Sequence, residues 1–469
     1  MLMRISGIVL ACACFPALTL AQAGAPSGSD MQKVSDLQRV MERLDRLEKQ
    51  NAELLSEIHE LRQELGTTRQ PAMPPQTGAS PPQAVQTETP PSPPTPAERL
   101  DVLESRTQDL AQTRVETSQR MPVSLTGMLL FNAFHNGGFG GPGEVPSTAQ
   151  LNQSPSSTGA TFRQTVIGLR FYGPNLPGGG KASGSAYFDF WGGSSAPNNN
   201  LFRVRLATID LAWKNYTITV GQDKPIVSPR EPMSLAQVGL APLSGSGNLW
   251  DWQPQIRVER RFGSDTMGLR AQAGIYETSE VVPATAPPVT LERQRPGYES
   301  RFLFYRGGET RRIEFAPGLH FSTTHVNGQA VDSRLFTMDW LVKPSSFLEV
   351  SGAWFGGTND AGLGAMRQGF TVLPGGRIIP VHAAGGWSQL SLFPTSRLSL
   401  HFFGGEEEDR AADLVANSVR RNLSYAGNIV YKLAPNILAA LEASQTRTDY
   451  ISSGLRRNNH YDLALAYLF

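Results

Sequence analysis

The last twelve residues, 458–469, alternate between two kinds of side chain, and this pattern limits the possible folds more than any other feature. Large apolar side chains occupy one phase and small or polar ones the other: Tyr461, Leu463, Leu465, Tyr467 and Phe469 against Asp462, Ala464, Ala466 and Leu468. A period of two residues indicates a β-strand. The apolar face suits contact with lipid and the polar face suits a water-filled lumen, although the edge strand of a soluble sheet shows the same alternation.

Similar stretches of about ten residues recur from Met121 to the C-terminus. We predict sixteen strands, at 123–132, 164–172, 182–191, 203–213, 216–221, 255–262, 268–276, 298–305, 313–324, 334–342, 347–355, 386–392, 398–403, 422–431, 437–444 and 458–469. Short turns alternate with long connections, which include 135–160, 222–252, 278–295 and 356–383. This layout is typical of a transmembrane β-barrel, in which closure removes the unpaired strand edges that lipid would not tolerate.

The predicted fold is therefore an all-β transmembrane barrel of about sixteen antiparallel strands over 121–469. An even strand count places both barrel ends on the short-turn side, so the last strand must pair with 123–132 and carry Phe469 to that rim. Asp462 then becomes a lumen or rim group. A terminal aromatic residue on such a strand also resembles the C-terminal signal of bacterial outer-membrane barrels. We therefore expect the lipid bilayer of that membrane as a partner, with a soluble all-β protein as the alternative.

The N-terminus carries the features of a secretory signal peptide over residues 1–23. Arg4 is followed by an apolar core and by the small-x-small cleavage site at 21–23. Both cysteines, Cys12 and Cys14, lie inside this segment, so we expect a mature chain without thiols. A lipoprotein site at Cys12 is an alternative, but the apolar segment before it is short.

Residues 31–66 follow a heptad pattern that predicts a coiled coil. The a positions are Leu37, Leu44, Asn51, Ile58 and Leu65, and the d positions are Val40, Leu47, Leu54 and Leu61. This helix should lie in the periplasm, on the short-turn side, and should associate with copies of itself; a lone amphipathic helix is the alternative. Residues 67–96 are proline-rich and predict an extended linker, and 97–119 predict a short, weaker helix before the barrel.

The connection 222–252 has an unusual composition for a long loop. It is rich in small residues and proline, with scattered Leu, Val and Ile. Such a segment is unfavourable in water, so we expect it to fold into the barrel and narrow the pore, with Asp223, Lys224, Arg230 and Glu231 as its charged groups. The alternative is a surface loop packed on itself or on a neighbouring subunit.

Charged residues occur within the predicted strands. The barrel region carries 25 Arg and 5 Lys against 26 acidic residues, and its strand arginines should face the lumen, because an arginine facing mid-depth lipid costs roughly 2–4 kcal/mol. These are Arg170, Arg203, Arg205, Arg257, Arg270 and Arg301. Acidic residues take the same polar phase: Asp189, Glu259, Glu299, Glu314, Asp339, Glu349 and Glu442. Free guanidinium groups would favour anionic solutes. A structural ion-pair network that holds the pore open is the competing interpretation.

The layout of signal, coiled coil, proline-rich tether and sixteen-stranded barrel resembles the phosphate-selective porin O/P family and its DcaP-like relatives. Local similarity covers Gly221-Gln222-Asp223, the stretch 248–257 (NLWDWQPQIR), the stretch 164–169 (QTVIGL) and Arg203-x-Arg205-x-Ala207. The resemblance implies a homotrimeric passive channel. Phosphate-selective members also rely on a lysine-rich vestibule, whereas lysine is rare here and Val166 stands where relatives carry arginine. A broader preference for small anions, such as dicarboxylates, therefore fits better.

Catalytic motifs are missing from the sequence. The seven histidines show no metal-ligand spacing, and no GxSxG or Walker loop is present. His320 and His401 fall on the polar phase of strands, where we interpret them as wall residues. A barrel hydrolase would need a serine beside a histidine at one depth, which a sequence does not show. We therefore expect a protein that is not an enzyme and that has no cofactor or metal.

Two functions fit these patterns. The first is an outer-membrane porin, a passive diffusion channel for small polar, anionic solutes. The second is an outer-membrane anchor or spacer that acts through its coiled coil, with peptidoglycan as a partner. A net charge of +1 gives no indication of nucleic-acid binding.

Overall fold

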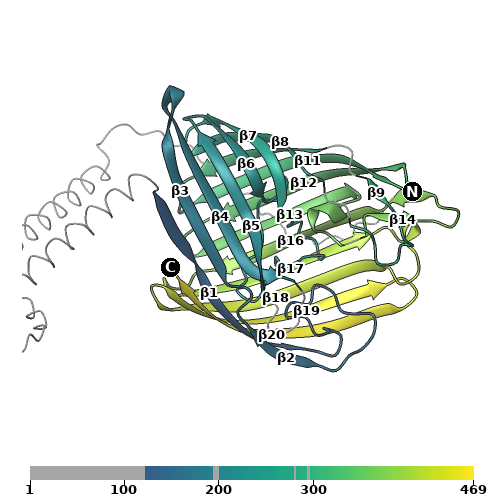
Figure 1. Ribbon diagram of the computed structural model, residues 1–469. Helices are drawn as coiled ribbons and strands as arrows, with labels where there is room; N and C mark the ends of the chain where they lie inside the picture. The colour runs from purple at the N-terminus through teal and green to yellow at the C-terminus, as the bar shows by residue number, and fades with distance from the viewer. Residues whose placement is uncertain (1–121, 194–199, 279–280, 293–295, 367) are drawn as a thin grey trace, which may run out of the picture. The chain divides into compact units, whose positions relative to one another are not determined.

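The computed structural model describes residues 122–193, 200–278, 281–292, 296–366 and 368–469. Within these residues, sixteen long antiparallel strands form one closed barrel (Figure 1). They are β1 (Val123–Asn136), β3 (Val166–Leu176), β4 (Gly180–Gly192), β5 (Leu201–Ala212), β6 (Tyr216–Asp223), β7 (Gln253–Gly263), β8 (Met267–Tyr276), β10 (Gly297–Gly307), β11 (Arg312–Val326), β12 (Gln329–Lys343), β13 (Leu348–Thr358), β16 (His382–Leu392), β17 (Leu398–Asp409), β18 (Val419–Ala434), β19 (Ile437–Tyr450) and β20 (Gly454–Leu468). Each predicted strand corresponds to one of them, and the observed strands extend further at many ends. The sixteen-stranded antiparallel barrel is thus confirmed.

The barrel closes where β20 pairs with β1, as Figure 1 shows for these neighbouring strands. The register runs from Met128 opposite Leu468 to Asn136 opposite His460. Beyond the last ladder pair, the backbone N–H and C=O of Gly127 exchange hydrogen bonds with those of Phe469 at 2.9 and 3.1 Å. The predicted closing pair is therefore confirmed, and it leaves neither strand with a free edge.

Side chains alternate across the barrel wall as a period of two requires. On β20, Tyr461, Leu463 and Leu465 face outward and are about half exposed, whereas Ala464 and Ala466 are buried on the inner side. Asp462 also points inward, where it accepts a hydrogen bond of 2.9 Å from Asn132 Nδ2. An outer surface of large apolar side chains and an inner surface of polar ones suits a wall that separates lipid from water.

The connections at the two ends of the barrel differ in length. The end that holds Val123 and Phe469 has short turns, whereas the opposite end carries the long connections. Two connections at that opposite end are nevertheless short, so the alternation is less regular than expected. They are 451–453 and the two-residue turn Asn327–Gly328, whose residues both have positive φ (49° and 74°), as a tight hairpin turn requires.

The long connections contain small elements of their own. These are β2 (Ser157–Thr161), β9 (Leu291–Glu292), β14 (Phe370–Val372) and β15 (Ile378–Pro380), with 3₁₀ turns η2 (Ala361–Leu363) and η3 (Ala411–Asp413); a third 3₁₀ turn, η1 (Pro177–Gly179), lies at the short-turn end. Among the residues that the structure describes, no helix has the length and hydropathy needed to cross a bilayer. The predicted signal peptide (1–23), coiled coil (31–66), linker (67–96) and short helix (97–119) lie outside the described residues, so they stay predictions.

Candidate functional site: the segment inside the barrel and its charged anchors

The connection between β6 and β7, residues 224–252, lies inside the barrel; we call it the inner segment. Its apolar side chains pack against inward-facing residues from widely separated strands. Leu235 joins a cluster with residues of β1, β18, β19 and β20, whereas Val227 and Leu249 join one with residues of β12 and β13. Leu243 packs on β13, β16, β17 and β18. The inner segment therefore passes between different sides of the wall instead of lying along one of them.

Amide and carboxylate side chains of the wall hold the backbone of the inner segment. The largest share comes from Gln164, two residues before β3, whose Nε2 donates to Ala236 O (2.9 Å) and whose Oε1 accepts from Val238 N (2.7 Å) and Gly239 N (2.8 Å). Four further anchors are Asn132 to Leu235 O, Asn428 to Met233 O, Asn422 to Gly245 O and Glu299 to Ile226 N, at 2.6–2.8 Å. These bonds satisfy backbone groups that would otherwise be buried without partners.

At one position the inner segment touches the wall backbone directly. Gly247 has φ of 93°, and a Cβ atom there would lie 2.5 Å from the carbonyl oxygen of Glu406. Only glycine combines this backbone conformation with so close an approach.

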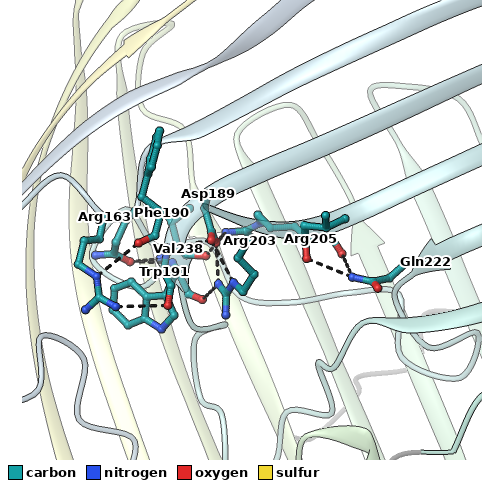
Figure 2. A network of polar contacts seen from close by, with 11 residues as sticks. Arg163, Asp189, Phe190, Trp191, Arg203, Arg205, Gln222 and Val238 are labelled. Carbon is teal, nitrogen blue, oxygen red and sulfur yellow. Dashed lines mark hydrogen bonds and ion pairs between the residues drawn. The ribbon is translucent and has the colours of Figure 1, made fainter. Parts of the chain in front are cut away.

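A cluster of charged groups joins β4 and β5 to the inner segment (Figure 2). Asp189 is fully buried and accepts hydrogen bonds from two guanidinium groups. Arg203 binds it with Nε (3.0 Å) and Nη2 (2.6 Å), and Arg205 binds it with Nη1 (3.0 Å). The same two arginines donate to the inner-segment carbonyls of Gly239 and Val238, each at 2.6 Å. Because two guanidinium groups share one carboxylate, the trio keeps one positive charge.

An aromatic ring completes this cluster. The Trp252 ring lies 4.8 Å from the guanidinium carbon of Arg203 and 4.7 Å from that of Arg205. The side chains of these arginines remain 26% and 15% exposed. Cation–π contact and the shared carboxylate hold both arginines in fixed positions, and neither Nη1 of Arg203 nor Nη2 of Arg205 takes part in these bonds.

A second charged cluster joins the inner segment to β10, β11 and β12. Arg301 binds Asp339 through Nε (2.7 Å) and Nη2 (2.8 Å), and Arg230 of the inner segment reaches the same carboxylate through Nε (2.8 Å). Arg230 also pairs with Glu314, which takes a further bond from Arg312. Three arginines thus meet two carboxylates, and the excess charge is again positive.

The remaining predicted site residues have varied surroundings. Arg257 pairs with Asp223 at 2.8 Å, and Lys224 pairs with Glu231 at 2.9 Å. Towards the short-turn end, Arg170 is exposed and donates to Tyr187 OH at 3.1 Å. The guanidinium of Arg270 lies 5.5 Å from the centre of the Tyr305 ring.

The structure thus brings most of the predicted residues together, but in ion pairs and not as a row of free cations. Asp189, Glu299, Asp339 and Arg301 are all at least 95% buried. Sequence reasoning did not single out the amides Asn132, Asn422 and Asn428, nor Gln389, which accepts a hydrogen bond from Met233 N of the inner segment at 2.6 Å. Their position on the inward phase of a strand could have indicated this role, because burying an amide side chain is costly unless it forms hydrogen bonds.

A serine, a histidine and a carboxylate lie in line on the inner wall. His320 Nε2 is 2.9 Å from Ser333 Oγ, and His320 Nδ1 is 3.1 Å from Glu299 Oε1. The arrangement has the order of a hydrolytic triad. However, His320 and Ser333 are each 2% exposed, and the other oxygen of Glu299 is taken by Ile226 N. Ser333 is therefore out of reach of a solute. The hydrogen bonds among Ser333, His320 and Glu299 instead help to hold the inner segment in place.

Acidic groups gather on a different part of the wall. Glu407 and Asp409 of β17 are buried and hold the connection 359–381, through Met366 N (2.8 Å) and Gln368 Nε2 (2.6 Å). Glu442 of β19 accepts from Ser234 Oγ of the inner segment at 2.6 Å. The arginine-rich clusters on β4, β5 and β10–β12 are thus separated along the wall from an acidic region on β17–β19.

The barrel resembles solved structures of outer-membrane channels. The outer membrane channel DcaP of Acinetobacter baumannii superposes with a TM-score of 0.61, at 15% identity over 74% of this chain and 97% of that one. The fold of the barrel described above is therefore that of an outer-membrane porin. An anion-selective porin from Comamonas acidovorans gives a TM-score of 0.53, at 12% identity over 74% of this chain and 99% of the other. No family model and no curated protein sequence matches the chain.

Proposed function

We propose that this chain is an outer-membrane porin that lets small polar, anionic solutes cross by passive diffusion. The pore would be what the inner segment leaves open within the barrel. The proposal rests first on the trio of Arg203, Arg205 and Asp189, which places two guanidinium groups, on partly exposed side chains, on the inner wall against one carboxylate. The fold supports a channel, and this excess of positive charge supports the preference for anions.

The geometry also suggests how a solute would pass. An anion such as a small carboxylate would exchange water for the N–H groups of Arg203 and Arg205, and would leave again because Asp189 already takes part of their hydrogen-bonding capacity. Weak binding of this kind favours flux, because a tightly held solute would block the pore. No step in this scheme breaks a covalent bond.

A planar-bilayer recording tests the proposal directly. With a tenfold KCl gradient across the membrane, the reversal potential should have the sign of a chloride-selective pore. Arg203→Gln with Arg205→Gln should move it towards zero, whereas Arg334→Gln, on the outer face of β12, should leave it unchanged. A cation-selective reversal potential would overturn the anion preference, and a correctly folded barrel without conductance would overturn the channel function.

The proposal includes the assembly state. The resemblance to the phosphate-selective porin O/P family leads us to expect three copies per assembly, each with its own pore. Light scattering of the detergent-solubilised protein, corrected for bound detergent, should give three times the mass of one chain. A monomeric mass at micromolar concentration would contradict this part of the proposal and leave the channel function open.

A further inference from the structure

Two arginines lie side by side on the outer face of the barrel, away from the pore. Arg447 of β19 and Arg457 of β20 are directly opposite each other in the antiparallel ladder. Both take the outward phase of their strands, since their neighbours in sequence, Thr446, Thr448 and Asn458, are buried on the inner side. Like charges directly opposite each other in a ladder repel, so a negatively charged group nearby would stabilise this pair.

Neutral groups hold Arg447 in place. Its Nε donates to Gln445 Oε1 (2.6 Å), its Nη2 donates to Tyr425 OH (2.9 Å), and its guanidinium lies 5.3 Å from the centre of the Tyr425 ring. Gln445 in turn donates to Asn459 Oδ1 at 2.8 Å. Among the described residues, Arg447 meets no carboxylate and Arg457 has no hydrogen bond or ion pair.

The acidic residues nearby are engaged elsewhere or lie further off. Glu406 pairs with Arg421 at 2.6 Å, and Asp449 pairs with Arg420. Glu408 lies on β17, opposite Arg421 and two strands away from Arg447. The arginine pair therefore presents an excess of positive charge to the outside of the barrel.

The position of Arg447 and Arg457 along the barrel axis indicates which part of the membrane surrounds them. Along β20 the outward residues from Tyr461 to Phe469 are all apolar or aromatic. At roughly 3.3 Å per residue and a tilt of about 40°, this stretch covers approximately 20 Å of the barrel axis, close to the thickness of a lipid-facing band. Arg457 comes about 10 Å further towards the long-loop end, and Tyr425 and Tyr461 border the band below it, as interfacial aromatics do.

We infer that Arg447 and Arg457 bind the phosphate of a lipid headgroup in the leaflet on the long-loop side. The two guanidinium groups offer N–H donors in the geometry that phosphate oxygens accept, and Tyr425 supplies a ring at the level where headgroup and acyl chain meet. The inference rests on the membrane location in the proposed function, but not on the solute or the direction of selectivity. It requires no covalent chemistry.

Thermal unfolding of the full chain in detergent micelles tests the site. Three probes are compared: phosphatidic acid, diacylglycerol with the same acyl chains, and inorganic phosphate. Phosphatidic acid should raise the melting temperature of the natural protein, and the other two should not. In Arg447→Gln with Arg457→Gln, the concentration of phosphatidic acid needed for the same shift should rise about tenfold or more.

A matched control and a second variant keep the test decisive. Arg334→Gln removes an outward arginine that already pairs with Asp332 at 2.6 Å, and it should leave lipid binding unchanged. Arg457→Gln alone removes an exposed side chain that has no hydrogen bond or ion pair among the described residues, so it should fold normally and still weaken binding. Equal shifts in natural and doubly substituted protein would overturn the inference, as would equal shifts from diacylglycerol or from free phosphate.

Bilayer conductance separates this inference from the proposed function. The doubly substituted protein should conduct like the natural one, because neither arginine lies on the inner wall. A natural protein that binds phosphatidic acid through these arginines but does not conduct would overturn the porin function and leave the lipid site standing.

Discussion

Replacing Gln164 by Met should release the middle of the inner segment, around residues 236–239, from the residues that hold it. The Gln164 side chain is buried and makes three hydrogen bonds to inner-segment backbone, at Ala236 O, Val238 N and Gly239 N. Methionine has a similar length and volume and can fill the same space. It cannot replace these three bonds or the fourth bond of Gln164, from Nε2 to Asn132 Oδ1 at 3.1 Å, so the change separates the contribution of the hydrogen bonds from that of packing.

The expected magnitude follows from the groups left behind. Three backbone groups lose their partner in a buried site, and each unsatisfied group costs roughly 1–3 kcal/mol. Even the lower end of that range totals about 3 kcal/mol. Since a factor of ten corresponds to approximately 1.4 kcal/mol, the released population of this stretch should rise roughly a hundredfold. Asn132 and the Arg203–Arg205 pair still hold the neighbouring carbonyls, so the release should be local.

A cysteine introduced at a buried position of the inner segment can measure how often this stretch is released. Ala236 is 2% exposed, so a thiol in Ala236→Cys reacts with a maleimide only when the stretch leaves the wall. The natural cysteines, Cys12 and Cys14, both lie near the N-terminus and can be replaced by Ala. Labelling should be at least tenfold faster when Gln164→Met is added, and single-channel recordings should show added current fluctuations.

The control applies the same substitution to an amide that holds a different connection. Gln329 donates to Gly376 O at 2.8 Å and accepts from Ile378 N at 3.1 Å. Gln329→Met should therefore leave the labelling rate of Ala236→Cys unchanged. Equal rates in the Gln164→Met and natural backgrounds would refute the reasoning, because they would mean that the hydrogen bonds of Gln164 do not hold this stretch.

Three further predictions concern the charged cluster, the close approach and the closing strand. Asp189→Asn should increase anion selectivity, seen as a larger chloride-type reversal potential, since it removes the one negative charge between Arg203 and Arg205. Gly247→Ala should destabilise the barrel by about 2–4 kcal/mol in denaturant titrations, since its Cβ would overlap the wall backbone. Deleting Phe469 removes two closing backbone hydrogen bonds and should lower the yield of heat-modifiable, folded barrel severalfold in outer-membrane fractions.

Much of the fold could be predicted because it depends on short-range patterns. Alternation with a period of two marks each strand, and a closed barrel must pair its first strand with its last, so the pairing of β1 with β20 followed from the strand count. The placement of 224–252 inside the barrel also followed from local composition, because a long apolar connection has few other places to be buried.

The charge arrangement depended on the tertiary structure. Arg230 and Asp339 are more than a hundred residues apart, and their contact depends on the path of the inner segment across the lumen. Neither that path nor the arrangement of side chains across several strands is encoded in a local pattern. Sequence alone could therefore predict arginines and acids on the inner face, but not that two guanidinium groups would share Asp189. Strand register likewise decided that Arg447 stands opposite Arg457, because a shift of one residue would have turned one of them into the lumen.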